Sequence, residues 1–453
     1  MENKKQPIQT AKRQIMLKES RMATRSIERS PLVFERPLSN RWIRMRFQGA
    51  MKSLIPALCA LSLPLHGEMT VVSDFEGGNA EAVEIDRVNR VIRIMPELRE
   101  GRGWPCWWYF RLEGLTAGET FKLEVQAQAE PYREQTVLAA SWCQPKHAWL
   151  SADGSTWHPS TKGVLTPEKV MVYKIKAEAP EVSIAWGPPF VPRDGERLLN
   201  EIAALLPDAE VFELAKTKGG RPVSGIRIGA EDAHHQVWVG SRQHAWEAGG
   251  SQVGRGFIKW YASDEAKDLR SKTCLHYIPI MDVDNAAQGA GGKDSIPRDH
   301  NRDWAAEPIY PEVAAAQRMI RAIQAKQGLD VYIDLHNPGH DDPTFFFGPF
   351  AFERMTGIQQ RNYQRWIDLA AINIREPYPV QPKYRFATYV KTDEERGRMS
   401  SGWVRANTGS STISVTLETT WNSPEMSVEG YGKVGAGLGR ALAAYLAEEP
   451  GRN

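Results

Sequence analysis

Four short apolar runs in the second half of the chain constrain its fold most, because they alternate with helical patterns. The runs have the length of buried strands and cover residues 237–240, 277–281, 331–335 and 413–417. The helical patterns cover residues 312–327, 352–374 and 432–447. This alternation predicts an α/β domain over residues 205–450, in which helices cover the faces of one sheet. In such sheets, functional residues gather beyond the strand ends.

The preceding part of the chain has a different pattern, with short strand-like runs and no helical periodicity. Examples are residues 90–94, 107–112 and 120–126, the last two separated by Gly114 and Gly118. Regularly spaced short strands predict a small antiparallel β-sandwich over residues 69–186. The Gly- and Pro-rich sequence that follows predicts a linker over residues 187–204.

Six tryptophans in the predicted sandwich allow two interpretations, a sugar-binding surface or packing in a core or interface. They are Trp104, Trp107, Trp108, Trp142, Trp149 and Trp157. Packing is favoured, because large aromatic side chains dominate the cores and interfaces of small domains.

The N-terminal segment is basic, although the whole chain carries a formal net charge of only +2. Residues 1–50 hold 12 Lys and Arg against 4 acids and show little apolar periodicity, which predicts a disordered extension. The rest of the chain shows no basic stripe, so no nucleic-acid partner is expected.

An apolar run after Met51 has the form of a secretory signal peptide over residues 51–67. In that case Met51 is the start, residues 1–50 are not translated, and the protein is periplasmic or secreted. The alternative is a cytoplasmic protein with a long tail. No other stretch is apolar enough to span a bilayer, so stable membrane insertion is not expected.

Cys106 and Cys143 would form a disulfide after export or remain isolated buried thiols.

Three residues near the predicted strand ends have the chemistry of a zinc site. His244 and Glu247 follow the run that ends at residue 240, and His336 follows the run at 331–335. Two imidazoles and one carboxylate suit a single Zn²⁺ and leave a coordination position for water. Each signal is weak alone, because His-x-x-Glu is a common spacing and a lone histidine at a strand end is more often structural.

Two further polar features occupy comparable positions. Arg298, Asn301 and Arg302 lie in a charged cluster that suits capture of a carboxylate, or that is simply surface. Glu418 ends the apolar run at 413–417. A half-buried glutamate beside a metal is suited to act as a general base for water.

The order of these motifs resembles that of the zinc carboxypeptidases of the funnelin type. Within them the chain is most similar to the cytosolic-carboxypeptidase-like branch, which adds an N-terminal β-sandwich. The resemblance covers about residues 205–450 and implies a mixed-sheet α/β/α catalytic domain. Asp299-His300-Asn301-Arg302 resembles the family's Asp-Leu-Asn-Arg signature. By position, the resemblance implies that Asn301 and Arg302 bind the substrate carboxylate, Asp299 orients His244, and Glu418 is the general base.

The chain departs from the family pattern at three places. His300 replaces the usual leucine, and the family's oxyanion-stabilising arginine falls at Gly292. The neighbouring Lys293 is either the replacement cation or a solvated loop lysine. Tyr389 is only a candidate for the family's substrate-capping tyrosine.

The expected activity is therefore removal of a C-terminal residue from peptides or proteins by a zinc metallocarboxypeptidase. The alternative is a zinc amidohydrolase acting on N-acyl amino acids or cell-wall peptides. A binding protein on a degenerate peptidase fold is disfavoured by the intact ligands and Glu418. Acidic substrate tails would call for a basic pocket, for which Lys383, Arg385 and Lys391 are candidates. No oligomeric state follows from the sequence.

Overall fold

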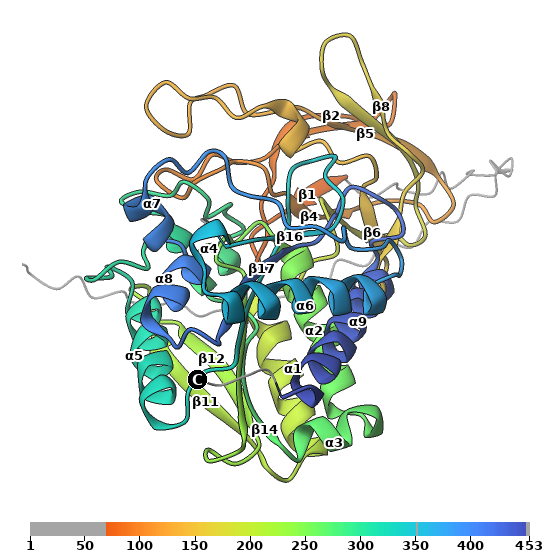
Figure 1. The fold of residues 1–453 in the computed structure, drawn as a ribbon. Coiled ribbons are helices and arrows are strands. Elements are labelled where there is room, and N and C mark those ends of the chain that lie inside the picture. The colour runs from red at the N-terminus through yellow and green to blue at the C-terminus, as the bar shows by residue number, and fades with distance from the viewer. Residues whose placement is uncertain (1–68, 350–351, 450–453) are drawn as a thin grey trace, which may run out of the picture. The chain divides into compact units, whose positions relative to one another are not determined.

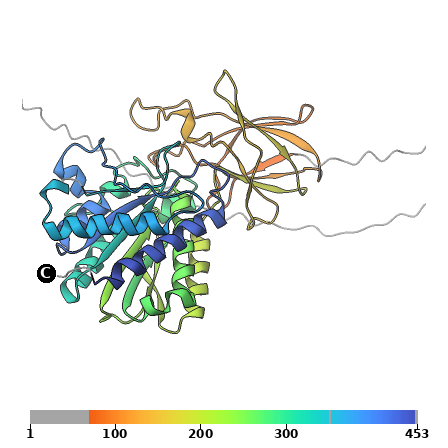
Figure 2. The ribbon, with the colours of Figure 1, turned by 45° about the vertical axis from the view of Figure 1, so that its right-hand side comes forward.

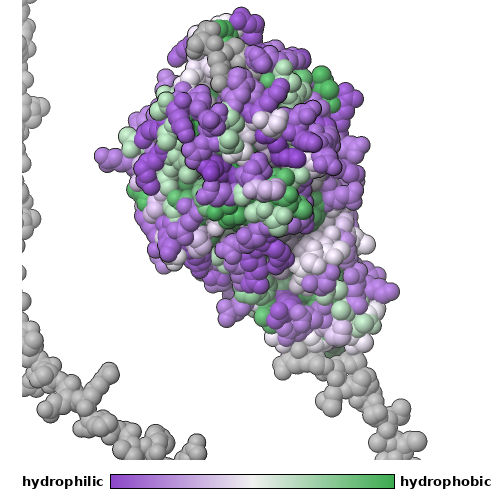
Figure 3. All heavy atoms as spheres, turned by 90° about the horizontal axis from the view of Figure 1, so that it is seen from below, coloured by the Kyte–Doolittle hydropathy of each residue, from purple (hydrophilic) through white to green (hydrophobic). Residues whose placement is uncertain are grey.

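The computed structural model describes residues 69–349 and 352–449, which belong to one unit of the chain, Leu63–Asn453 (Figure 1). The basic extension and the signal peptide expected over residues 1–50 and 51–67 lie outside the described residues. None of the described helices combines the length and apolar character needed to cross a membrane. On the face seen in Figure 3, polar side chains cover most of the surface and apolar ones form smaller patches.

The N-terminal part, called here the β domain, consists of two five-stranded sheets. The first has the order β1 (Thr70–Val72), β4 (Tyr109–Glu113), β10 (Val182–Ala185), β6 (Trp149–Ser151) and β7 (His158–Pro159). The second has the order β2 (Glu81–Asp86), β3 (Val91–Met95), β5 (Thr120–Val125), β9 (Met171–Lys176) and β8 (Val164–Leu165). All strand pairs are antiparallel except β3 with β5, which differs from the fully antiparallel expectation. Because β4 lies in the other sheet, the chain leaves after β3 and returns alongside it in the same direction.

Alternate side chains of both sheets fill one common core. Phe121, Leu123 and Val125 of β5 contribute to the same buried cluster as Phe110 and Leu112 of β4. This two-residue period is the pattern of strands with one buried face. Of the six tryptophans considered above, Trp107, Trp108 and Trp149 are buried, as the packing interpretation requires.

The sheet of the following part, called here the α/β domain, is mixed and has seven strands. Its order is β11 (Ala209–Lys216), β12 (Pro222–Ile228), β14 (Thr273–Ile278), β13 (His235–Ser241), β15 (Val331–His336), β17 (Ile413–Glu418) and β16 (Phe345–Phe347). The four neighbouring strands β14, β13, β15 and β17 are parallel and fully buried. The remaining strands pair antiparallel at the two edges. This architecture confirms the predicted α/β fold class with a mixed sheet.

Helices lie on both faces of this sheet (Figures 1 and 2). Helix α2 packs with α9 and against β15, while α5 and α8 lie on the other side. This arrangement follows from right-handed crossovers, because the chain moves from β13 to β14 through α2 and back across to β15 through α5. The described α-helices are α1 (Pro192–Leu205), α2 (Ala248–Ala262), α3 (Lys267–Arg270), α4 (Val283–Ala287), α5 (Pro311–Lys326), α6 (Gly357–Asn373), α7 (Asp393–Gly397), α8 (Ser400–Asn407) and α9 (Val428–Ala447). Short 3₁₀ turns are η1 (Ala140–Trp142), η2 (Asp264–Ala266), η3 (His300–Arg302) and η4 (Phe352–Arg354).

The stretch expected to be a linker, 187–204, contains most of helix α1. Pro192 occupies the first turn of that helix, where proline is well tolerated because its missing N–H has no intrahelical partner. Leu198, Leu199 and Ile202 are buried in the core around the seven-stranded sheet. Only residues 187–191 connect β10 and its following turn to this helix.

Candidate active site

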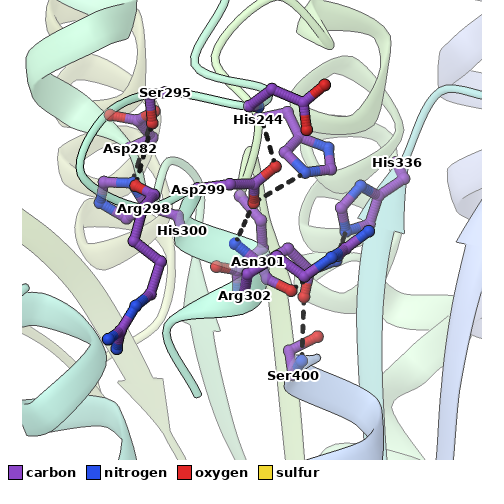
Figure 4. Close-up of polar contacts among 12 residues, drawn as sticks. His244, Asp282, Ser295, Arg298, Asp299, His300, Asn301, Arg302, His336 and Ser400 are labelled. Carbon is purple, nitrogen blue, oxygen red and sulfur yellow. Dashed lines mark hydrogen bonds and ion pairs between the residues drawn. The ribbon is translucent and has the colours of Figure 1, made fainter. Parts of the chain in front are cut away.

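Two adjacent parallel strands bring three side chains that could hold a metal ion to one point. His244 follows β13, Glu247 lies directly before α2, and His336 is the last residue of β15. The Nδ1 atoms of His244 and His336 lie 2.8 and 2.7 Å from the two carboxylate oxygens of Glu247. One ligand atom from each residue lies within 4.8 Å of the others, and all three side chains are buried. Figure 4 shows the two imidazoles side by side.

This donor set fits the single zinc ion that the sequence predicts. Two imidazole nitrogens and a carboxylate oxygen are the ligands of an open catalytic zinc site. Burial alone would raise the pKa of Glu247, but the two histidines outweigh it and hold that pKa below its usual value. Glu247 is therefore an anionic donor, as a metal ligand must be.

Carboxylates behind the two imidazoles fix their orientation. Asp299 Oδ1 lies 3.2 Å from Nε2 of His244, as expected from the resemblance. Asp334 Oδ2 lies 2.9 Å from Nε2 of His336 and also accepts a hydrogen bond from the Ser400 hydroxyl. Such partners keep the opposite ring nitrogen directed at a metal. The sequence interpretation gave no role to Asp334, although a strand places residues two apart on the same face and Asp334 precedes His336 by two.

The short turn η3 presents Asn301 and Arg302 to the site. Asp299 caps this turn, accepting a hydrogen bond of 2.7 Å from the backbone N–H of Asn301. The Asn301 side chain accepts from the backbone N–H of Ser400, and Arg302 donates to the Asn301 carbonyl (Figure 4). The guanidinium of Arg302 lies 6.0 Å from the ring centre of Tyr389.

His300 is buried and makes its own ion pairs, separate from the metal ligands. Its Nε2 lies 2.7 Å from Glu312, and its ring stacks on Tyr310. Burial lowers the pKa of His300, but Asp282 and Glu312 outweigh that effect and raise it to about 9. The histidine that replaces the family's leucine is therefore a cationic core residue.

Glu418 is the last residue of β17 and pairs with His336 in the strand register. It is 8% exposed, and its Oε2 has no hydrogen-bond partner among the described residues. Burial raises the pKa of Glu418 to about 7. A carboxylate with this pKa exchanges protons readily near neutral pH.

A cavity of about 390 Å³ brings these side chains together. Eight of the nine predicted site residues line it, and the ninth, Asp299, lies behind His244. Its other lining residues include Trp104 and Trp142 of the β domain, which sequence patterns alone could not assign to the site. The residues considered for a basic pocket, Lys383, Arg385 and Lys391, are not among the described residues that line it. Arg385 instead pairs with Asp342 at 2.7 Å.

Gly292, where the family's arginine is expected, has no room for a larger side chain. Gly292 has a φ of +78°, and a Cβ there would lie 2.5 Å from an Asp282 carboxylate oxygen and 2.8 Å from the Ala245 nitrogen. A larger residue at 292 is thus excluded. The next residue, Lys293, lines the cavity. Among the described residues, neither Lys293 nor Arg302 has a carboxylate within ion-pair distance, so both cations are available to an anionic substrate group.

Comparisons with known proteins agree with this geometry. The family model described as "Cytosolic carboxypeptidase N-terminal domain" matches residues 71–186, and that described as "Zinc carboxypeptidase" matches residues 195–308. Cytosolic carboxypeptidase 2 of Danio rerio is 22% identical over 314 residues, covering 61% of this chain but only 42% of that protein. Cytosolic carboxypeptidase 6 of Caenorhabditis elegans is 20% identical over 371 residues, covering 75% of this chain and 77% of that protein.

Solved structures share the fold. A metallo-carboxypeptidase from Burkholderia cenocepacia superposes with a TM-score of 0.71 at 21% identity, covering 84% of this chain and 99% of its own. One from Pseudomonas aeruginosa, solved in complex with (2-guanidinoethylmercapto)succinic acid, gives 0.67 at 20% identity, with the same coverage of both chains. The fold and the arrangement of His244, Glu247 and His336 are thus those expected of the zinc carboxypeptidase class. The two family models cover about half of the sequence, and the chain belongs to the zinc carboxypeptidase family, with the N-terminal domain of the cytosolic carboxypeptidases.

Proposed function

We propose that this protein is a metallocarboxypeptidase that hydrolyses the C-terminal peptide bond of peptides or proteins. The observation that supports this most is that the three grouped candidate ligands, Glu418 and the Arg302 guanidinium, which has no ion-pair partner among the described residues, line one cavity. His244, Glu247 and His336 would hold one zinc ion, which when bound lowers the pKa of water and polarises a carbonyl oxygen.

Substrate binding depends on the terminal carboxylate. Arg302 offers a planar guanidinium that suits bidentate pairing with a carboxylate, and Asn301 adds an amide beside it. Tyr389 is 56% exposed and its ring centre lies 6.0 Å from the Arg302 guanidinium, which supports a role in covering a bound terminal residue. These contacts would fix the scissile bond beside Glu418.

The chemical step uses Glu418 and Lys293. Glu418 takes a proton from the attacking water and returns it to the leaving amine, which its buried carboxylate can do near neutral pH. Lys293 supplies positive charge to the oxyanion that develops on the carbonyl oxygen. This single cation would stand in for the arginine that Gly292 excludes.

A zinc amidohydrolase acting on N-acyl amino acids or cell-wall peptides is the second candidate. It would use Arg302 for the same carboxylate, and the geometry of the site does not separate the two. The two activities differ in the group on the acyl side of the scissile bond, which is a peptide chain in the first and an acyl group or cell-wall peptide in the second.

The two candidates separate in one experiment. Zinc content is measured by metal analysis, and the loaded protein is incubated with free and C-terminally amidated peptides and with N-acyl amino acids. We expect stepwise loss of single C-terminal residues by mass spectrometry and no reaction of amidated peptides. Arg302→Ala should raise KM strongly for free peptides. Hydrolysis of N-acyl amino acids alone would favour the second candidate, and internal cleavage would contradict both.

We also propose a cytoplasmic location. The two named relatives are described as cytosolic carboxypeptidases. The three described cysteines, Cys106, Cys143 and Cys274, are buried free thiols, and unpaired cysteines are typical of a reducing compartment. The periplasmic alternative rests on residues 51–67, outside the described residues.

A further inference from the structure

The β domain contacts the active-site loop that carries Lys293, called here the Lys293 loop (residues 289–296). Three backbone hydrogen bonds join this loop to residues 101–104 of the β domain. They run from Gly292 N–H to the Arg102 carbonyl (2.9 Å), from Trp104 N–H to the Lys293 carbonyl (3.0 Å) and from Ile296 N–H to the Gly101 carbonyl (2.8 Å). The backbone of the loop is thus hydrogen-bonded directly to the backbone of the β domain.

The fit between the two segments is tight. A Cβ at Gly103 would lie 2.2 Å from the Lys293 carbonyl oxygen, so only glycine allows this approach. On its other side the Lys293 loop contacts the metal-ligand segment, since Gly291 accepts a hydrogen bond of 3.0 Å from the Trp246 N–H. The loop is therefore held between the β domain and the residue that precedes Glu247.

Trp104 acts on the side chains of the loop as well. The Lys293 ammonium lies 5.2 Å from the centre of the Trp104 ring, within the range of a cation–π interaction. The indole N–H of Trp104 donates to Asp294 at 2.9 Å, and the Tyr132 hydroxyl donates to the same oxygen at 3.2 Å. Asp294 is the carboxylate nearest in sequence to Lys293, and these two donors of the β domain satisfy it. The described structure accordingly contains no ion pair between Asp294 and Lys293.

We propose that Trp104 is a positioning residue, through which the β domain holds Lys293 in the cavity and keeps its charge free for the substrate. This inference depends on the oxyanion role given to Lys293 under the proposed function. It makes the β domain part of the catalytic machinery: Trp104 holds the ammonium by its ring and the neighbouring Asp294 by its N–H.

The test is a double-mutant cycle on the zinc-loaded full chain, with zinc content and thermal midpoint measured for every variant. Lys293→Met should lower kcat by about 10²-fold, the loss typical when one oxyanion donor is removed. Trp104→Leu should lower kcat by at least about tenfold while KM changes little, because the contact matters to the transition state. In the Lys293→Met background, Trp104→Leu should lower kcat by less than about threefold, because the two residues act as one unit.

Two further variants separate positioning from general packing. Trp104→Phe keeps a ring against the ammonium but loses the hydrogen bond to Asp294, so its kcat should lie between wild type and Trp104→Leu. It also serves as the milder variant if the leucine variant does not fold. Trp157→Leu is the matched control, since Trp157 packs on Tyr109 of the β domain and does not line the active-site cavity; its kcat should equal that of wild type.

A second readout does not require turnover. Binding of a phosphinic peptide, whose tetrahedral phosphorus and charged oxygen resemble the transition state, is measured by calorimetry on the same variants. Trp104→Leu and Lys293→Met should weaken it by similar factors. Losses of kcat that multiply in the double variant, or a Trp104→Leu variant with wild-type kcat, would overturn the positioning role alone. A Lys293→Met variant with full kcat and phosphinate affinity would overturn the Lys293 step of the proposed function, and the positioning role with it.

Discussion

Glu418 is the residue on which the proposed chemical step depends most directly. Glu418→Gln keeps the size of the side chain and removes its ability to accept a proton. We expect kcat to fall by about 10²–10⁴-fold, the usual contribution of a general base. Zinc content should be unchanged, since Glu418 is not among the three grouped ligands. Metal analysis with steady-state kinetics tests this, and a variant with wild-type kcat would contradict the mechanism.

The pH dependence of the reaction follows from the environment of the same carboxyl group. Burial raises the pKa of Glu418 to about 7, so the base form is lost as pH falls through that value. Because a bound dication favours the ionised form, the acid limb of kcat/KM should lie at or below pH 7. Lys293 also lowers this pKa, so Lys293→Met should move the limb to higher pH. A limb that does not move, or that moves down, would show that Lys293 does not face Glu418.

At the scale of elements, the edge strand β16 shapes the part of the cavity beyond Glu418. Phe345 pairs with Glu418 and Phe347 with Thr416 in the strand register, and all four side chains line the cavity. Met399 lines it as well and packs in a small apolar cluster with Phe347. The acid nearby, Asp342, is paired with Arg385.

This lining predicts a preference for apolar C-terminal residues. Among peptides that differ only in their last residue, Phe, Leu or Met should give kcat/KM values about tenfold or more above those of Glu or Lys, because an uncompensated charge is costly among these side chains. Phe347→Lys should reduce the difference for acidic residues. Glutamate as the best terminal residue of the unmodified enzyme would contradict this interpretation of β16.

The four buried parallel strands could be predicted from the sequence because such strands form distinctive apolar runs, whereas their order in the sheet could not. His244, Glu247 and His336 could be placed together because such strands end at one edge. The contributions of Trp104, Trp142 and β16 to the cavity could not be predicted from the sequence. They depend on how the β domain packs and on an edge strand of only three residues, Phe345–Phe347, too short to leave a pattern. Helix α1 could not be predicted either, because its Pro-rich start has the composition of a linker.

At the scale of the whole molecule, aromatic packing joins the β domain to the metal site. Trp246 lies next to the candidate ligand Glu247, yet it belongs to the buried cluster of the β domain together with Trp421. Trp186 of the β domain lies 5.5 Å from Trp246 and 4.2 Å from Trp421, measured between ring centres. A cluster shared in this way couples the folding of its two parts, because neither can unfold without exposing the aromatic surface of the other.

We therefore expect the described unit to unfold in a single thermal transition, and we expect zinc to raise the midpoint of that transition. A metal that binds only the folded state at about 1,000 times its Kd stabilises it by about 4 kcal/mol, which should raise Tm by roughly 5–10 °C. Near-UV circular dichroism, which reports the tryptophans, and far-UV circular dichroism should give coincident curves with and without a chelator. His336→Ala should abolish the shift, while Glu418→Gln should retain it. Two transitions, of which zinc moves only one, would show that the tryptophan cluster does not couple the β domain to the metal site.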